Sequence, residues 1–304
     1  MTQQAPNASS HRPQQKRALL VSVLTYAVLV FWSLVCLFPL YWIAVTSLKG
    51  NPEIMRGPYY VPFVDFTPSL DAWVDVLDYA NDHLLLRFFN SAVVAIISTL
   101  LTVLFGGMAV YGLTRFRYAV RWIPALHNDG ILFAILATRI LPPVVVVIPI
   151  YMMALYTGSL DTHFALIFTY TAANLPVAVW LLLPVFGNMA TSQEEAAQLD
   201  GASHFRIFLT IFLPMVAAST AAVGLVIFIL CWNEYLFAAF LTSDKVSTLP
   251  PWIAAQMSIK EAQTGGDGDE WSQLSAAIIF MIAPLLACTA FTQRVFGRMA
   301  SRGK

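Results

Sequence analysis

The sequence has 304 residues, of which 58% are hydrophobic and 11% are charged, with a formal net charge of zero. Together with a mean hydropathy of +0.69, this composition excludes a soluble domain of this size and predicts an integral membrane protein with no nucleic-acid partner. Cys36, Cys231 and Cys288 lie inside apolar runs and the five histidines are scattered, so no disulfide framework, metal site or cofactor is expected.

The chain begins with a basic tail, residues 1–17, and continues as one predicted transmembrane domain, residues 18–304. A helix needs about 20 apolar residues to cross a bilayer core, and six runs meet this requirement. The predicted spans lie at about residues 19–45, 88–114, 131–157, 163–188, 215–242 and 271–293. The fold class is therefore an all-α membrane protein with six transmembrane helices.

Two long connections separate these spans on one side of the membrane. The first, residues 48–86, is rich in proline and acid, and Leu70, Trp73, Val74 and Leu77 within it have the spacing of a surface helix. The second runs from Ser243 to Glu270. In the third span, Pro142 and Pro143 predict a kink, since neither can donate a backbone hydrogen bond.

The distribution of basic residues predicts the orientation. The N-terminal tail, the 115–121 loop, the 190–214 segment and the C-terminal tail hold 11 of the 17 Lys and Arg residues. All four segments lie on one side if there are six spans, and the positive-inside rule makes that side cytoplasmic. Both termini and the 190–214 loop are therefore expected in the cytoplasm.

The 190–214 loop is a polar segment between two apolar runs. Ser192 and Glu195 have the spacing of a capping box, with Thr191 and Glu194 as the alternative register, so a short helix is predicted. Gly201 ends it, as a plain C-cap or as a hinge. A second amphipathic helix follows, with one apolar face formed by four residues: Phe205, Phe208, Leu209 and Phe212.

The same segment resembles the cytoplasmic coupling loop, or EAA motif, of ABC importer permeases. The matching residues are Glu195, Ala196, Ala197, Asp200, Gly201, Ala202, Ile211, Leu213 and Pro214. R-F-F-N-S-A (residues 87–92), A-V-Y-G-L-T-R-F-R-Y (109–118), L-P-P-V-V-V-V-I-P-I-Y (141–151), L-P-V-A-V-W (175–180) and C-W-N-E-Y-L-F-A (231–238) are similar to the carbohydrate-transport branch, near the smaller maltose permease subunit.

The resemblance implies the type I importer fold in a bacterial inner membrane. It implies four kinds of partner: the bilayer, a second permease subunit, two cytoplasmic ATPase subunits and an extracytoplasmic solute-binding protein, which the second exposed loop reaches in relatives of the maltose type. The ATPase-coupling residues implied are Glu194, Glu195, Ala196, Ala197, Asp200, Gly201 and Ala202. Glu195 is then either a structural cap or the carboxylate that pairs with a basic residue of the ATPase.

Polar residues within the spans are candidates for the translocation path. Arg139 either lines a wet path or extends towards the cytoplasm, because a charge at this depth is costly in lipid. The same question applies to Asn174, Asn233 and Glu234, the last of which lies near the outer surface if the helix is regular.

No nucleotide-binding pattern G-x-x-x-x-G-K-[ST] occurs, so the chain is not expected to be an enzyme, and ATP hydrolysis is assigned to separate subunits. The expected function is the permease of a binding-protein-dependent importer for a sugar, polyol or related solute. Two alternatives remain: a permease of the same superfamily for amino acids or peptides, and an ion-driven secondary transporter, which would have internal repeats with paired broken helices.

Overall fold

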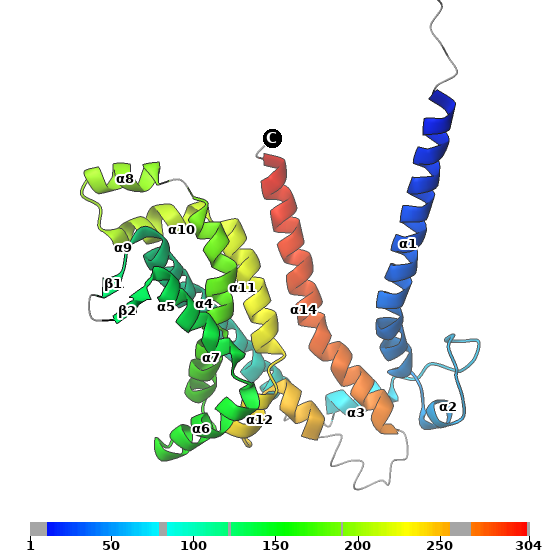
Figure 1. The fold of residues 1–304 in the computed structure, drawn as a ribbon. Helices are drawn as coiled ribbons and strands as arrows, with labels where there is room; N and C mark the ends of the chain where they lie inside the picture. Colours follow the sequence, from blue (N-terminus) through cyan, green and yellow to red (C-terminus); the bar gives the residue numbers. More distant parts are fainter. Residues whose placement is uncertain (1–10, 79–83, 121–122, 190, 256–268, 303–304) are drawn as a thin grey trace, which may run out of the picture. The chain divides into compact units, whose positions relative to one another are not determined.

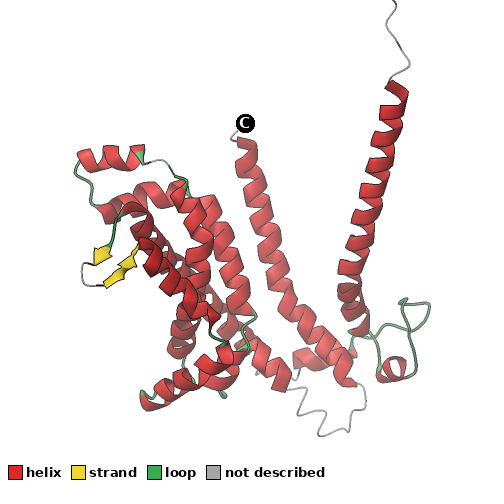
Figure 2. Ribbon diagram, viewed as in Figure 1, coloured by secondary structure: helices red, strands yellow, loops and turns green. Residues whose placement is uncertain are grey.

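The computed structural model describes residues 11–78, 84–120, 123–189, 191–255 and 269–302. Within these ranges the regular secondary structure is helical apart from one two-stranded hairpin and one isolated bridge, and loops connect the helices (Figures 1 and 2). The predicted helical membrane fold is therefore confirmed. The first ten residues of the basic tail, Ala190 and residues 256–268 of the second exposed loop lie outside the described ranges.

The described residues form two compact units. The first lies within Met1–Val74 and Asp267–Ile279, and the second lies within Asp75–Gly266 and Phe280–Lys304. Four helical elements belong wholly or partly to the first unit: α1 (His11–Thr46), α2 (Asn51–Met55), α3 (Asp71–Asp78) and α14 (Asp269–Arg302). In α1, residues 21–41 are exposed and mostly apolar, which is typical of a helix that faces lipid or another chain.

The segment after α1 is held by a few specific contacts. The buried ammonium of Lys49 lies 4.4 Å from the centre of the Trp42 ring. Asp65 accepts hydrogen bonds from the backbone N–H groups of Tyr60 and Val61, both at 2.8 Å. These bonds favour the charged carboxylate and so lower the pKa of Asp65.

Three long helices make the core of the second unit: α4 (Leu84–Arg115), α7 (His163–Gly187) and α11 (Ala217–Trp232). The backbones of α4 and α7 approach closely at Gly106, where an added Cβ would lie 2.9 Å from the Cβ of Ala178. A larger residue at position 106 would therefore push the two helices apart. Val110, Leu182 and Ile227 are fully buried between the three helices.

A sharp bend divides the third predicted span. The helices before and after it are α5 (Asn128–Ala137), continued by one 3-10 turn, η1 (Thr138–Ile140), and α6 (Pro143–Tyr156). Their axes differ by 93°. Leu141 and Pro142 have extended backbone and Pro143 begins α6, where its missing N–H leaves no partner unsatisfied. The kink predicted from the prolines is confirmed.

A hairpin that the sequence did not predict connects α4 to α5. Its strands are β1 (Ala119–Val120) and β2 (Ile123–His127). Asn128 fastens this connection to the end of α4, because its amide nitrogen donates to the carbonyls of Leu113 and Phe116 at 2.6 and 2.7 Å. Its amide oxygen accepts from the N–H of Tyr118.

The chain after α7 consists of short helices. They are α8 (Ser192–Leu199), α9 (His204–Ile207), a single π-helical turn η2 (Phe208–Phe212) and α10 (Leu213–Met215). The segment His204–Met215 meets α11 at 86°. After α11 the helix breaks at residues 233–235 and resumes as α12 (Leu236–Leu241), so the span predicted over 215–242 is interrupted. Residues 249–255 are also helical.

Among the described residues, four helices are long and apolar enough to cross a membrane, and the number rises to six if each bent pair is one span. In the second unit, α8 and α9 lie at one end of the α4, α7 and α11 bundle, and α6 and α12 lie at the other (Figure 1). The two ends of this unit therefore face opposite sides of the membrane.

We expect the α8 end to be cytoplasmic. In a background without Cys36, Cys231 and Cys288, Ser192→Cys should be protected from an impermeant thiol reagent added to spheroplasts, and Lys245→Cys should react, since both positions are exposed. Permeabilised cells serve as the control in which both positions label. Labelling of Ser192→Cys in sealed spheroplasts would reverse the orientation.

Candidate functional site

The two ends of the helix α8 are defined by different features of the backbone. Its N-cap is Thr191, whose side chain makes no capping bond, so the predicted capping box of Ser192 and Glu195 is wrong, as is its alternative register. At the other end, Gly201 has φ +82°, and Gly201 and Ala202 donate to the carbonyls of Gln198 and Ala197. This is a Schellman motif, in which only glycine adopts the required backbone without strain.

One side chain of α8 is directed into the protein. Glu194 is 3% exposed, and its carboxylate forms an ion pair with Arg115 at the end of α4, with Arg115 Nη2 at 2.8 Å and Nε at 3.0 Å from Oε1. The hydroxyl of Tyr111 donates to Oε2 at 3.1 Å. Both carboxylate oxygens are therefore satisfied, which a buried charge requires.

Arg115 joins α8 to two further parts of the chain. Its Nη1 donates to the carbonyl of Phe186 at 3.5 Å and its Nη2 to that of Met189 at 3.3 Å, at the end of α7. A cation is favoured there, because the last carbonyls of a helix carry partial negative charge. The guanidinium also lies 5.2 Å from the centre of the Phe212 ring.

An aromatic cluster supports this ion pair. The Tyr111 ring packs against Phe208 and Phe212 with centroids 5.2 and 5.1 Å apart, and Phe186 packs edge-on against Phe212 at 4.7 Å. The π turn η2 directs Phe208 and Phe212 inward, whereas Phe205 and Leu209 are exposed. Two of the four residues of the predicted apolar face thus pack against the protein, and a π turn interrupts the regular α-helix that the prediction assumed.

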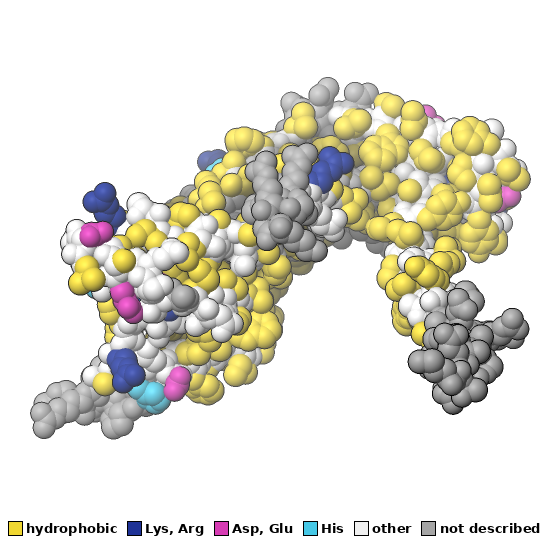
Figure 3. Space-filling model, turned by 90° about the horizontal axis from the view of Figure 1, so that it is seen from above, with side chains coloured by type: hydrophobic (Ala, Val, Ile, Leu, Met, Phe, Trp, Pro, Cys, Tyr) yellow, Lys and Arg dark blue, Asp and Glu magenta, His cyan; other side chains and the backbone are white. Residues whose placement is uncertain are grey.

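The remaining surface of α8 faces outward. Glu195, Ala196, Asp200 and Gly201 are exposed, and Ala197 and Ala202 are half-buried. Glu195 Oε1 accepts a hydrogen bond from the hydroxyl of Thr191 at 2.7 Å. Leu199, which is 91% exposed, lies on the same helix. Seen from this end of the second unit, acidic and basic side chains lie apart from one another among polar and hydrophobic ones (Figure 3).

Local sequence patterns do not predict that Arg115 and Tyr111 belong to this site. Arg115 is one of the basic residues that predict the orientation, and Tyr111 lies within an apolar run. The sequence indicates a buried partner through two adjacent acidic residues, Glu194 and Glu195. On a helix, adjacent residues are about 100° apart, so both carboxylates cannot face the same surroundings.

The four path candidates divide into two pairs. Asn174 is 7% exposed and donates to the Tyr170 carbonyl at 2.9 Å and to Cys231 Sγ at 3.4 Å, and Glu234 Oε1 accepts from the N–H of Phe237 at the start of α12. Both are thus engaged within the chain. Arg139 and Asn233 are exposed, and each donates to one carbonyl, that of Ala173 and of Ile229 respectively.

Arg139 lies beside a cavity of about 190 Å³ at the bend between η1 and α6. Thr138, Thr169 and Phe237 also line it, so the bend of the third span and the first turn of α12 meet there. Leu141, which has extended backbone, also lines the cavity, and irregular backbone at membrane depth is tolerated only where protein or water covers it.

Residues 119–302 match the family described as binding-protein-dependent transport system inner membrane component. The diacetylchitobiose uptake system permease protein NgcG of Streptomyces coelicolor is 28% identical over 93% of this chain and 88% of its own. A probable ABC transporter permease protein, y4oR of Sinorhizobium fredii, is 30% identical over 94% and 95%. The trehalose/maltose transport system permease protein MalG of Thermococcus litoralis is 28% identical over 87% and 90%.

Solved structures share the fold. A chain of a bacterial ABC transporter involved in import of the acidic polysaccharide alginate superposes with a TM-score of 0.70, at 19% identity over 96% of this chain and 100% of that one. A second alginate transporter structure, in complex with a periplasmic protein bound to an alginate pentasaccharide, gives a TM-score of 0.62 at 13% identity over 94% and 97%.

Proposed function

Because this chain belongs to the family of binding-protein-dependent transport system inner membrane components, we propose that α8 couples ATPase subunits to the import of a carbohydrate. The chain is a multi-pass inner-membrane permease subunit of an ABC transporter. Its partners in this proposal are a second permease subunit, two cytoplasmic ATPase subunits that hydrolyse ATP, and a solute-binding protein.

The arrangement of α8 is the observation that supports the coupling role. The helix is fastened to α4 through Glu194, whereas Glu195, Ala196 and Asp200 are exposed together with Leu199. A short helix with a charged and apolar outer surface and a buried internal anchor is suited to sit in a groove of another subunit. We assign the ATPase contact to Glu195 and the surrounding exposed residues.

A carbohydrate is the favoured solute because the relatives named for a substrate handle saccharides: diacetylchitobiose for NgcG and trehalose or maltose for MalG. Along the path, we assign contact with the solute or with path water to Arg139 and Asn233, the two exposed candidates. Asn174 and Glu234 position the helices through their internal bonds.

Reconstitution tests the proposal. Proteoliposomes that contain this chain alone should neither hydrolyse ATP nor accumulate solute, and both activities should appear with the partner permease, the ATPase subunits and the cognate binding protein. The solute is identified by the increase in thermal stability that a bound ligand gives the binding protein.

Each alternative has its own outcome in this experiment. Uptake driven by a proton or sodium gradient in vesicles with the chain alone would support a secondary transporter. Stabilisation of the binding protein by an amino acid or peptide, and not by any saccharide, would support a permease of the same superfamily for amino acids or peptides.

A further inference from the structure

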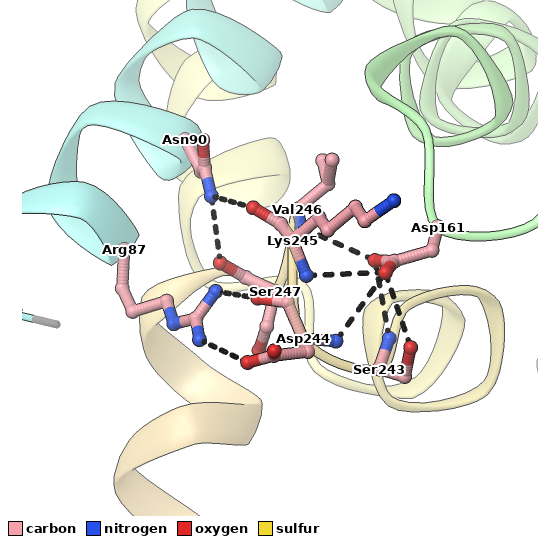
Figure 4. A network of polar contacts seen from close by, with 8 residues as sticks. All are labelled: Arg87, Asn90, Asp161, Ser243, Asp244, Lys245, Val246 and Ser247. Carbon is pink, nitrogen blue, oxygen red and sulfur yellow. Dashed lines mark hydrogen bonds and ion pairs between the residues drawn. The ribbon is translucent and has the colours of Figure 1, made fainter.

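Three charged side chains are buried in the part of the chain that the structure describes: Lys49, Arg87 and Glu194. Glu194 is paired with Arg115. Arg87 is 4% exposed and donates to the backbone carbonyl of Asp244 and, at 3.1 Å, to its carboxylate (Figure 4). Lys49 is buried to the same extent, yet its ammonium forms no ion pair or hydrogen bond with any described residue.

The loop around Asp244 shows how this chain satisfies its other charges. The Asp161 carboxylate accepts from the N–H groups of residues 243, 244, 245 and 246 at 3.1 to 3.4 Å (Figure 4). Partial burial by itself would raise the pKa of Asp161, but these four donors outweigh it and lower the pKa to about 2. A charged group that is removed from water is thus given several partners here, in contrast to Lys49.

Only aromatic rings surround the ammonium of Lys49. It lies 4.4 Å from the centre of the Trp42 ring and 5.6 Å from that of Phe66. An aromatic face attracts a cation but does not replace its hydrogen bonds to water. Burial therefore lowers the pKa of Lys49, and the charge of Asp65 offsets part of this shift, although these two described residues form no ion pair. The buried lysine lacks an anionic partner within the described chain.

A cavity of about 260 Å³ lies beside this lysine. It is lined by Trp42 and Thr46 of α1, by Lys49, by residues of α2 and by Trp271 of α14, all within the first unit. The hydroxyl of Thr46 is buried and has no hydrogen-bond partner among the described residues. Two polar groups without partners therefore border the same cavity, which an apolar filling would not satisfy.

An oxyanion is the ligand that these two groups fit. A lysine ammonium has three N–H donors and no acceptor, and the hydroxyl of Thr46 can donate as well. A phosphate group offers acceptor oxygens to both, and its negative charge compensates that of Lys49. The cavity is smaller than the about 300 to 1,000 Å³ of sites that enclose drug-sized ligands, so it suits a single small group.

The cavity lies where two candidate membrane spans end. These spans are Val21–Thr46 and Trp271–Arg294, and the last residue of the first and the first residue of the second both line the cavity. Tryptophan is enriched at the membrane–water interface, where the phosphate groups of the lipids also lie. Residues 21–41 of α1 are exposed and mostly apolar, so the acyl chains of the same lipid have a surface to lie along.

We propose that this cavity binds the phosphate group of a membrane phospholipid, with Lys49 and Thr46 as its donors and Trp42 and Trp271 beside it. A lipid bound there joins the end of α1 to the start of α14. The proposal uses the membrane location of the chain and is independent of the solute and of the coupling role of α8.

The test uses the complete complex, stripped of lipid in a detergent that contains no phosphate group. Three compounds are added separately: phosphatidylglycerol, the uncharged glycolipid digalactosyldiacylglycerol, and inorganic phosphate without lipid. The readouts are amide hydrogen exchange over residues 46–57, followed as a titration that gives the affinity, and the number of phospholipids that the complex retains in native mass spectrometry.

Three variants accompany the wild type. Lys49→Met keeps the length of the side chain and removes its charge, and Thr46→Val removes the hydroxyl and keeps the shape. Lys245→Met, which removes an exposed lysine of the second unit, is the control for the change of charge. Because neither Lys49 nor Thr46 has a hydrogen-bond partner among the described residues, the first two variants should match the wild type in thermal stability without lipid.

We expect phosphatidylglycerol, and neither of the other two compounds, to slow exchange over residues 46–57. Lys49→Met should lower the affinity for this lipid about tenfold or more, since hydrogen bonds from a charged donor are the strong ones. Thr46→Val should lower it about two- to tenfold, the range of a neutral hydrogen bond. Lys245→Met should bind as the wild type does.

Four results would overturn the proposal. Equal protection by the glycolipid would exclude phosphate as the recognised group, and equal protection by inorganic phosphate would assign the cavity to a soluble anion. A purely structural lysine gives a third pattern, in which Lys49→Met is less stable without lipid and its response to phosphatidylglycerol is unchanged. If Lys49→Met does not assemble, Thr46→Val decides the question, because a wild-type affinity in that variant is the fourth contrary result.

Discussion

Replacing Glu194 by alanine is expected to detach α8 from α4. The substitution leaves the Arg115 guanidinium, whose side chain is 11% exposed, without its carboxylate partner, and breaking a buried pair in this way costs about 3 to 5 kcal/mol. The hydrogen bond from Tyr111 is lost as well. Amide hydrogen exchange over residues 192–199 in the purified complex should accelerate accordingly, while exchange in the centre of α7 should not change.

Two further variants separate an ion pair from a general loss of packing. Glu194→Ala combined with Arg115→Met removes the stranded charge, so the double variant should protect α8 better than the sum of the two single effects predicts. Glu195→Gln, one position along, is the matched control and should leave the exchange of α8 unchanged. Strict additivity in the cycle would show that the pair contributes nothing specific.

Replacing Glu195 by lysine is expected to uncouple the transporter without loosening α8. If its carboxylate meets a basic groove of the ATPase, reversal of the charge should lower ATP-driven uptake by a factor of about 10 to 100, the range of typical coupling energies. Glu195→Gln, which keeps the shape and removes the charge, should lower uptake less. The measurements are uptake, ATP turnover and the yield of ATPase subunits that purify with the complex.

Thr191→Val serves as the control for the local role of Glu195. It removes the hydroxyl that donates to Glu195 Oε1 but leaves the carboxylate exposed for a partner. Uptake near that of the wild type in Thr191→Val, with impaired uptake in Glu195→Gln, assigns the function to the carboxylate itself. Normal uptake and normal ATPase retention in Glu195→Lys would contradict the coupling role.

Most of the membrane fold could be predicted from the sequence, because long uncharged runs admit few interpretations. The bend at Pro142 and Pro143 also followed directly from residue chemistry. The break after Trp232 did not, since residues 233–235 contain neither proline nor glycine. There the Glu234 carboxylate accepts from the N–H of Phe237 in the first turn of α12. The π turn at 208–212 was likewise outside any prediction that assumes a period of 3.6 residues.

The candidate site shows the same division. The position of α8 within the EAA motif and its end at Gly201 could both be predicted from the local sequence. Which of the two adjacent acids faces inward depends on a residue 79 positions away, Arg115, and that contact exists only in the folded chain. Local patterns could not predict the ion pair of Arg87 and Asp244 for the same reason, because these residues are 157 positions apart in the sequence.

Both ends of the helix α8 are held at the same place, the last turns of α4. One attachment runs through Glu194 to Arg115 and Tyr111, and the other returns through η2, where Phe208 and Phe212 pack on the same tyrosine ring. A helix attached at one point could pivot when another subunit presses on it, without moving the rest of the chain. Because both ends of α8 are held at the last turn of α4, we expect a force on α8 to displace α4 rather than to turn α8 about one point.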